Sequence, residues 1–173
     1  MTNRPQNFWY FSVALYGHEQ VTEACLDFQN LSGVDVNMIL FCYWHGTKLG
    51  EISPETMTQA LAISANWKRE LVQPLRNVRQ WMKLHGGDYP GTFRAQFDTL
   101  RSRIKSDELA AEKFQQELLE QVAMENPVQQ GTAGSAGACD RNIERYFVAI
   151  RLEQNDLIAI KLKTIASALQ FTA

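Results

Sequence analysis

The segment from Val36 to His45 constrains the fold more than any other part of the chain. It reads VNMILFCYWH, in which Asn37 is the only plainly polar residue before the closing histidine. Asp35 can cap the start of a helix here, and Gly46 can end it. A helix that is apolar on every side belongs at the centre of a domain. We therefore expect the helix over 36–45 to be the central and least exposed element.

The rest of the chain shows helical periodicity and almost no strand alternation. Asn7 can cap a first helix that Gly17 ends, and Asp140 can begin a helical tail. The sequence therefore predicts an all-α fold, a single-domain bundle of six or seven helices over 1–173. We expect helices over 8–16, 19–30, 36–45, 54–85, from 92 onward and from 140 onward, the last with a break near 154–155.

The stretch 54–85 begins with a strong helix signal, because Ser53 can cap it and Pro54 suits the first helical position. Pro74 lies inside the stretch and should kink the helix. The apolar spacing favours one bent helix over two separate helices, because it keeps its phase across Pro74. The apolar positions are 57, 61, 67, 71, 75, 78 and 82.

Composition supports one domain with a real core and excludes some partners. The chain has 173 residues, of which 45% are hydrophobic, and its formal net charge is −2. Bulk electrostatic attraction to nucleic acid is therefore not expected. The segment 126–138, NPVQQGTAGSAGA, lacks large apolar anchors apart from Val128 and is expected to be a flexible loop.

Cysteine usage and the N-terminal sequence favour a cytoplasmic location. The three cysteines, Cys25, Cys42 and Cys139, are widely spaced and odd in number, which is untypical of a disulfide framework or a zinc site. The aromatic N-terminal stretch is read as a structural helix and not as a secretory signal. No apolar run approaches the roughly 18 residues of a membrane span, so no transmembrane segment is expected.

Three segments carry a resemblance to a known family. They read NFWYFSVALYG, ACLDFQNLSGVDVNMILFCYWHG and WKRELVQPLRNVR. Together they resemble a short, conserved hypothetical family of bacterial proteins, a domain of unknown function. The resemblance covers about residues 7–83, continues more weakly over 100–105 and 108–112, and makes 126–138 look like an insertion. It implies an all-helical cytoplasmic protein and supplies no catalytic residues.

The sequence shows no catalytic set, cofactor motif or metal motif. None of His18, His45 and His85 has a second histidine or a cysteine at ligand spacing, and nucleotide-binding glycine motifs are missing. We therefore predict no catalytic residue, no cofactor and no metal. Glu108 and Glu112 are interpreted as a solvated helix face, partly paired with lysines, together with Glu117 and Glu120.

Two groups of residues are candidates for a binding site. Arg76 and Arg79 border the apolar face of the 54–85 helix, where a guanidinium could bind a carboxylate or phosphate. The alternative is that they pair with acidic residues of neighbouring helices. The four successive aromatic residues 8–11 cannot all face one core. The predicted ligand-binding residues are Phe8, Phe11, Phe41 and Trp44 for an apolar tail, and Arg76 and Arg79 for an anionic head.

We weigh three functions for such a chain. The first is a non-enzymatic binding protein for an apolar or amphiphilic, fatty-acid-like small molecule in a pocket between helices. The second is a protein–protein interaction module that uses the aromatic N-terminal edge or the basic flank of the 54–85 helix. The third is an enzyme of unknown class, which ranks last because no acid, base and nucleophile stand out.

Overall fold

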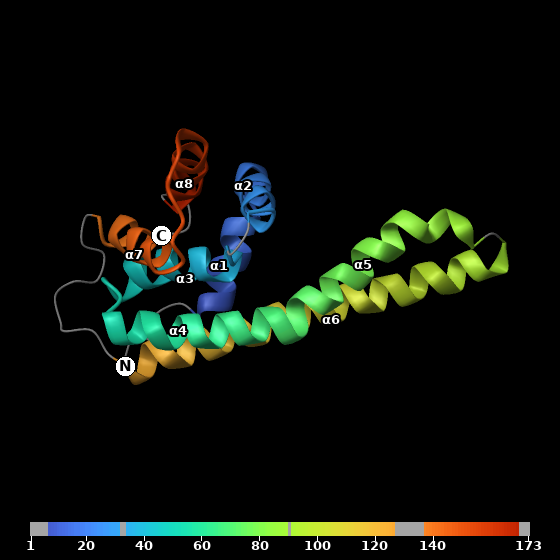
Figure 1. Cartoon of the computed structure of the whole chain (residues 1–173), viewed down its shortest axis with the longest axis horizontal. Helices are drawn as coiled ribbons and strands as arrows, with labels where there is room; N and C mark the ends of the chain where they lie inside the picture. Colours follow the sequence, from blue (N-terminus) through green and yellow to red (C-terminus); the bar gives the residue numbers. More distant parts are fainter. Residues whose placement is uncertain (1–6, 32–33, 90, 127–136, 170–173) are drawn as a thin grey trace.

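The computed structural model describes residues 7–31, 34–89, 91–126 and 137–169, and these residues form an all-α protein (Figure 1). The predicted fold class is confirmed. The π-helical turn η1 (Lys68–Val72) joins α4 to α5, and the 3-10 turn η2 (Gly86–Asp88) follows α5. The eight α-helices are α1 (Phe8–Tyr16), α2 (Glu19–Gln29), α3 (Val36–Lys48), α4 (Pro54–Trp67), α5 (Gln73–His85), α6 (Thr92–Glu125), α7 (Ala138–Ala149) and α8 (Asp156–Ala168).

The molecule has a compact body and a long projecting arm. In Figure 1, α1, α2, α3, α7 and α8 gather at one end, and α4 lies along them beside the end of α6. The arm consists of α5 and the first half of α6, which run side by side away from the body. We call the segment 70–107 the arm. Because the arm has only two helices, a large part of its side-chain surface faces outward.

Helix α3 is the centre of the body, as its sequence predicts. The side chains from Met38 to Trp44 have relative exposures of 0–1%. Asp35 caps the helix by accepting a hydrogen bond from the Asn37 backbone N–H. The expected stop at Gly46 is wrong, because the helix continues to Lys48. Gly46 instead allows α7 to approach closely, since a Cβ there would lie 2.7 Å from Cys139 Sγ.

The aromatic residues of α1 divide between the core and the surface. Phe8 and Phe11 are buried, whereas Tyr10 is 67% exposed. The Phe8 ring stacks on Trp44 with 5.3 Å between centroids and lies 5.8 Å from the Phe41 ring. The prediction that the four successive rings cannot all enter one core is therefore confirmed.

Residues 54–85 form one continuous helical rod, and its direction changes between α4 and α5 (Figure 1). The single bent helix is confirmed, but its phase slips. The π turn adds a residue just before Pro74, which has no N–H, and Gln73 N–H donates to the Lys68 carbonyl. As a result Val72 and Arg76 are buried, whereas Leu71 is exposed. The prediction of an unbroken apolar phase is wrong for this reason.

The C-terminal part follows the predicted pattern with shifted bounds. Most of the expected loop over 126–138 lies outside the described residues. At its end, Ala138 is buried and begins α7, two residues before the predicted start at Asp140. The predicted break near 154–155 is confirmed, and Asn155 caps α8 by accepting from the Ile158 N–H.

All three cysteines are free thiols, and Cys25 and Cys42 are buried as expected. Within the described ranges, none of the helices combines the length and apolar character that crossing a bilayer requires.

Candidate functional site

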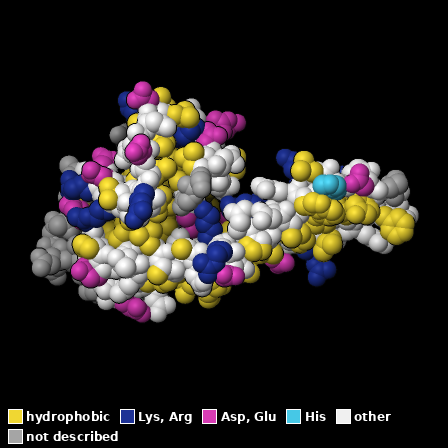
Figure 2. Space-filling view, in the orientation of Figure 1, with side chains coloured by type: hydrophobic (Ala, Val, Ile, Leu, Met, Phe, Trp, Pro, Cys, Tyr) yellow, Lys and Arg dark blue, Asp and Glu magenta, His cyan; other side chains and the backbone are white. Residues whose placement is uncertain are grey.

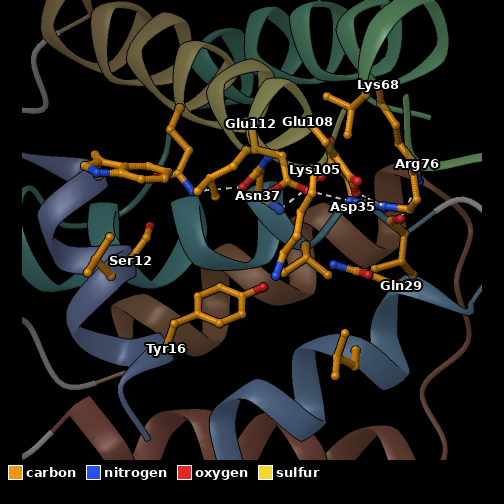
Figure 3. Close-up of a pocket in the computed structure, with 18 of the residues that line it drawn as sticks. Ser12, Tyr16, Gln29, Asp35, Asn37, Lys68, Arg76, Lys105, Glu108 and Glu112 are labelled. Atoms are coloured by element: carbon orange, nitrogen blue, oxygen red, sulfur yellow. Dashed lines mark hydrogen bonds and ion pairs between the residues drawn. The ribbon is translucent and has the colours of Figure 1, made fainter. Parts of the chain in front are cut away.

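A cavity of about 610 Å³ lies where the arm joins the body (Figure 3). Its walls come from α1, α2, the start of α3, η1, α5 and α6. The apolar lining residues are Trp9, Val13, Tyr16, Leu26, Val34, Val36, Val72 and Leu109. The polar and charged lining residues are Ser12, Gln29, Asp35, Asn37, Lys68, Arg76, Arg79, Lys105, Glu108, Glu112 and Gln116.

A hydrogen-bonded network holds the start of α3 against α6 beside this cavity. Asp35 Oδ2 accepts hydrogen bonds from Ser64 Oγ at 2.6 Å and Gln115 Nε2 at 2.5 Å. The Asn37 amide donates to Gln115 Oε1 and accepts from Gln116 Nε2, both at 2.8 Å. Such buried hydrogen bonds fix the positions of the side chains that make them. Asn37 therefore joins two helices, beyond the local turn contact that its position in the sequence suggests.

Two polar atoms on the cavity wall have no hydrogen-bond partner within the described part of the chain. They are Ser12 Oγ on α1 and Gln116 Oε1 on α6, and both are buried. Their residues are 2% and 3% exposed. A buried polar group without a partner costs free energy, so such groups call for an explanation. Both atoms have almost no accessible surface, so a ligand in the cavity would reach them only if their side chains rotated toward it.

Two arginines of α5 meet two glutamates of α6 on another wall. Arg76 donates to Glu108 at 2.9 Å and to Glu112 at 2.5 Å. Arg79 also donates to Glu108. The predicted solvated face is wrong for Glu108, which is buried, and for Glu112, which is half-buried. Of the two readings of Arg76 and Arg79, the structure shows the pairing with acidic residues of a neighbouring helix.

The two glutamates differ in their pKa shifts. Burial tends to raise the pKa of Glu108, but the hydrogen bonds and charges of Arg79 and Arg76 outweigh it, and the pKa lies below its usual value. Burial raises the pKa of Glu112, because the attraction of Arg76 offsets this effect only in part. Glu112 is therefore more readily protonated than Glu108.

The six predicted ligand-binding residues separate into two groups. Arg76 and Arg79 line the cavity. The four aromatic residues do not line it and pack in the core instead, each 0–1% exposed; they are Phe8, Phe11, Phe41 and Trp44. The α1 residues that line the cavity are the neighbours on the other face of that helix, including Trp9 and Ser12.

Among the described residues, no three His, Cys, Asp or Glu side chains gather closely enough to hold a metal ion. His45 is buried in the core, and its Nδ1 lies 2.8 Å from the Gly50 carbonyl oxygen. The cavity thus offers apolar walls, fixed hydrogen-bonding groups and ionic groups, which suit non-covalent binding.

Comparison with known proteins places the chain in a family. The sequence model of a family described as "Protein of unknown function (DUF2390)" matches residues 7–119, and the chain belongs to this family. All the residues that line the cavity fall within this range. No curated protein and no solved structure matches the chain.

Proposed function

We propose that this protein binds an amphiphilic small molecule in the cavity between the arm and the body. The observation that carries the proposal is a cavity of about 610 Å³ whose accessible wall surface is mainly apolar, although charged and polar residues also line it. Sites for small molecules usually enclose ~300–1,000 Å³ and combine apolar walls with a few placed polar groups. The three free cysteines support a cytoplasmic location as part of the same proposal.

The proposal moves the apolar tail from its predicted place. The tail would lie against Trp9, Val13 and Leu26, because Phe8 and Phe41 are enclosed in the core. If their side chains rotate toward the cavity, Gln116 Oε1 can accept a hydrogen bond from the ligand, and Ser12 Oγ can act as donor or acceptor.

Binding of the neutral apolar fluorophore N-phenyl-1-naphthylamine tests this function. We expect saturable fluorescence enhancement with about one site per chain. Val13→Trp should weaken binding at least tenfold, because Val13 lines the cavity and is half exposed, so the larger ring can enter the cavity without disrupting the core. Val148→Trp is the matched control, at an exposed valine of α7 outside the cavity lining. Non-saturable binding, or equal effects of the two variants, contradicts the proposal.

A second candidate function is protein interaction through the arm, and one observation favours it. Figure 2 shows apolar side chains gathered on the outer part of the arm. Trp81, Leu84 and Phe93 are 49%, 80% and 67% exposed. The outer part of the arm, 80–104, carries four basic and two acidic residues, a formal charge of +2. This charge opposes pairing with a second arm and favours an amphipathic helix with acidic flanks.

Two designed amphipathic peptides test the arm. They share one apolar face and carry either glutamate or lysine on the polar face. Fluorescence anisotropy should show binding of the glutamate peptide only, and Leu84→Ser together with Phe93→Ser should abolish it. Binding of neither peptide, or of both equally, contradicts the interaction function.

A further inference from the structure

The cavity contains more positive than negative charge. Its lining includes four basic residues, Lys68, Arg76, Arg79 and Lys105, and three acidic residues, Asp35, Glu108 and Glu112. Each of the three carboxylates already accepts hydrogen bonds from the protein: Asp35 from Ser64 and Gln115, and the two glutamates from the arginines. The two arginines offset the two glutamates, so the two lysines together with Asp35 leave a formal charge of +1 in the lining.

Neither lysine has a carboxylate partner among the described residues. Lys68 Nζ donates to the Val34 backbone carbonyl, which is a neutral acceptor. Lys105 makes no hydrogen bond or ion pair within the described part of the chain. Figure 3 shows the Lys105 side chain extending across the cavity toward Tyr16. Lys105 is exposed to solvent, so its attraction for an anion is screened by salt and depends on a direct hydrogen bond to the head group.

The surrounding groups favour the same ligand charge. Burial raises the pKa of Tyr16, so its hydroxyl stays protonated and adds no negative charge. Burial also raises the pKa of Glu112, so this carboxylate is more readily neutralised than Glu108, whose pKa is lowered. The arginines hold Glu108 and Glu112 on one wall, so the lysines remain available to the ligand.

We propose that the ligand of the cavity is an anionic amphiphile whose carboxylate or phosphate is bound by Lys105, with Lys68 as the second cation. This inference rests on the proposed function and names the chemical class of its ligand. It replaces the predicted head-group site at Arg76 and Arg79, whose guanidinium groups are occupied by Glu108 and Glu112.

Four probes with the same ten-carbon chain test the inference: decanoate, decyl phosphate, 1-decanol and decylammonium. Each probe is added below its own critical micelle concentration, and its displacement of bound N-phenyl-1-naphthylamine is measured. We expect at least one of the two anions to bind about tenfold more tightly than the alcohol, as a charge-assisted hydrogen bond provides, and decylammonium to bind most weakly. The stronger of the two anions distinguishes a carboxylate ligand from a phosphate ligand.

Variants of Lys105 test the contact itself. Lys105→Met should lower the affinity for the anions about tenfold and leave 1-decanol unchanged, whereas Lys105→Arg should retain anion binding. Lys163→Met, at an exposed lysine of α8 outside the cavity lining, should change neither. Equal binding of alcohol and anions, or equal losses for both in Lys105→Met, overturns the head-group inference while the proposed function stands. If the unaltered protein shows no saturable binding of the fluorophore, the proposed function itself is overturned.

Discussion

His45 is a titratable residue enclosed in the aromatic core. Its ring is buried between core aromatics, with its centroid 5.7 Å from that of Phe41 and 6.3 Å from that of Trp44. Nδ1 lies within hydrogen-bonding distance of the Gly50 carbonyl oxygen, at 2.8 Å, and Nε2 has no hydrogen-bond partner among the described residues. Burial lowers the pKa of His45, and the backbone hydrogen bonds offset this only in part.

This pKa shift makes stability depend on pH through His45. The folded protein keeps His45 neutral, while the unfolded chain takes up a proton below the ordinary histidine pKa of about 6.5. The stabilising contribution is therefore present above that value and is lost as the pH falls toward the folded pKa. Urea unfolding at pH 7.5 and 5.5 should show a smaller loss of unfolding free energy for His45→Gln than for the unaltered protein.

The control for this experiment is His85→Gln, which changes a half-buried histidine at the end of α5. We expect this variant to keep the pH dependence of the unaltered protein. An identical pH dependence for His45→Gln and the unaltered protein contradicts the role of His45.

At the scale of the element, the contact between α3 and α7 depends on Gly46. A Cβ at this position would lie 2.7 Å from Cys139 Sγ and 2.8 Å from the Cys139 Cα and N atoms. Backbone atoms in the middle of a packed interface cannot move without shifting α7.

Gly46→Ala should therefore destabilise the protein by roughly 1–3 kcal/mol, the usual cost of overpacking. Because the clash involves backbone atoms, we expect a loss near the upper end of this range, which exceeds the gain of ~1 kcal/mol that alanine brings to an isolated helix. The matched control is Gly87→Ala, because a Cβ at Gly87 meets no atom within 4 Å. Denaturant midpoints measure both variants, and a Gly46→Ala protein as stable as the control contradicts the close packing.

The sequence predicts where the helices lie along the chain better than it predicts which side of each helix is buried. Helix caps such as Asn7, Asp35 and Ser53 are local, so the starts of α1, α3 and α4 follow directly from residue chemistry. The π turn before Pro74 is not visible in a pattern that assumes 3.6 residues per turn. One extra residue there turns Arg76 inward and Leu71 outward.

The candidate site was predictable only in part for a similar reason. Arg76 and Arg79 lie on the border of an apolar face, and that position alone marks them as candidates. Ser12, Lys105 and Gln116 carry no local signal, because they enter the cavity through the packing of α1 against α6. Periodicity gives the buried face of a helix and does not give the helix against which that face packs.

At the scale of the whole molecule, the family model matches only part of the chain that builds the hydrophobic core. The matched residues 7–119 include all the lining of the cavity but neither α7 nor α8. The α3–α7 contact is nevertheless the most extensive helix pair in the described structure. Five large side chains of α7 and α8 belong to the buried core: Ile143, Tyr146, Phe147, Ile158 and Ile165.

A chain ending after Asn126 should therefore lose cooperative folding, although it retains the whole family match. Each fully buried large apolar side chain contributes ~1.5–3 kcal/mol, and a domain is stable by only about 5–15 kcal/mol in total. Without α7 the apolar surface of α3 would also face water, and Asp35 would lose the contact of its N–H with the Tyr146 hydroxyl. Differential scanning calorimetry should show no unfolding peak. A matched chain in which a Gly-Ser sequence of equal length replaces 127–136 keeps α7 and α8 and should unfold within a few degrees of the unaltered protein. Cooperative unfolding of the shortened chain would show that the family segment folds on its own.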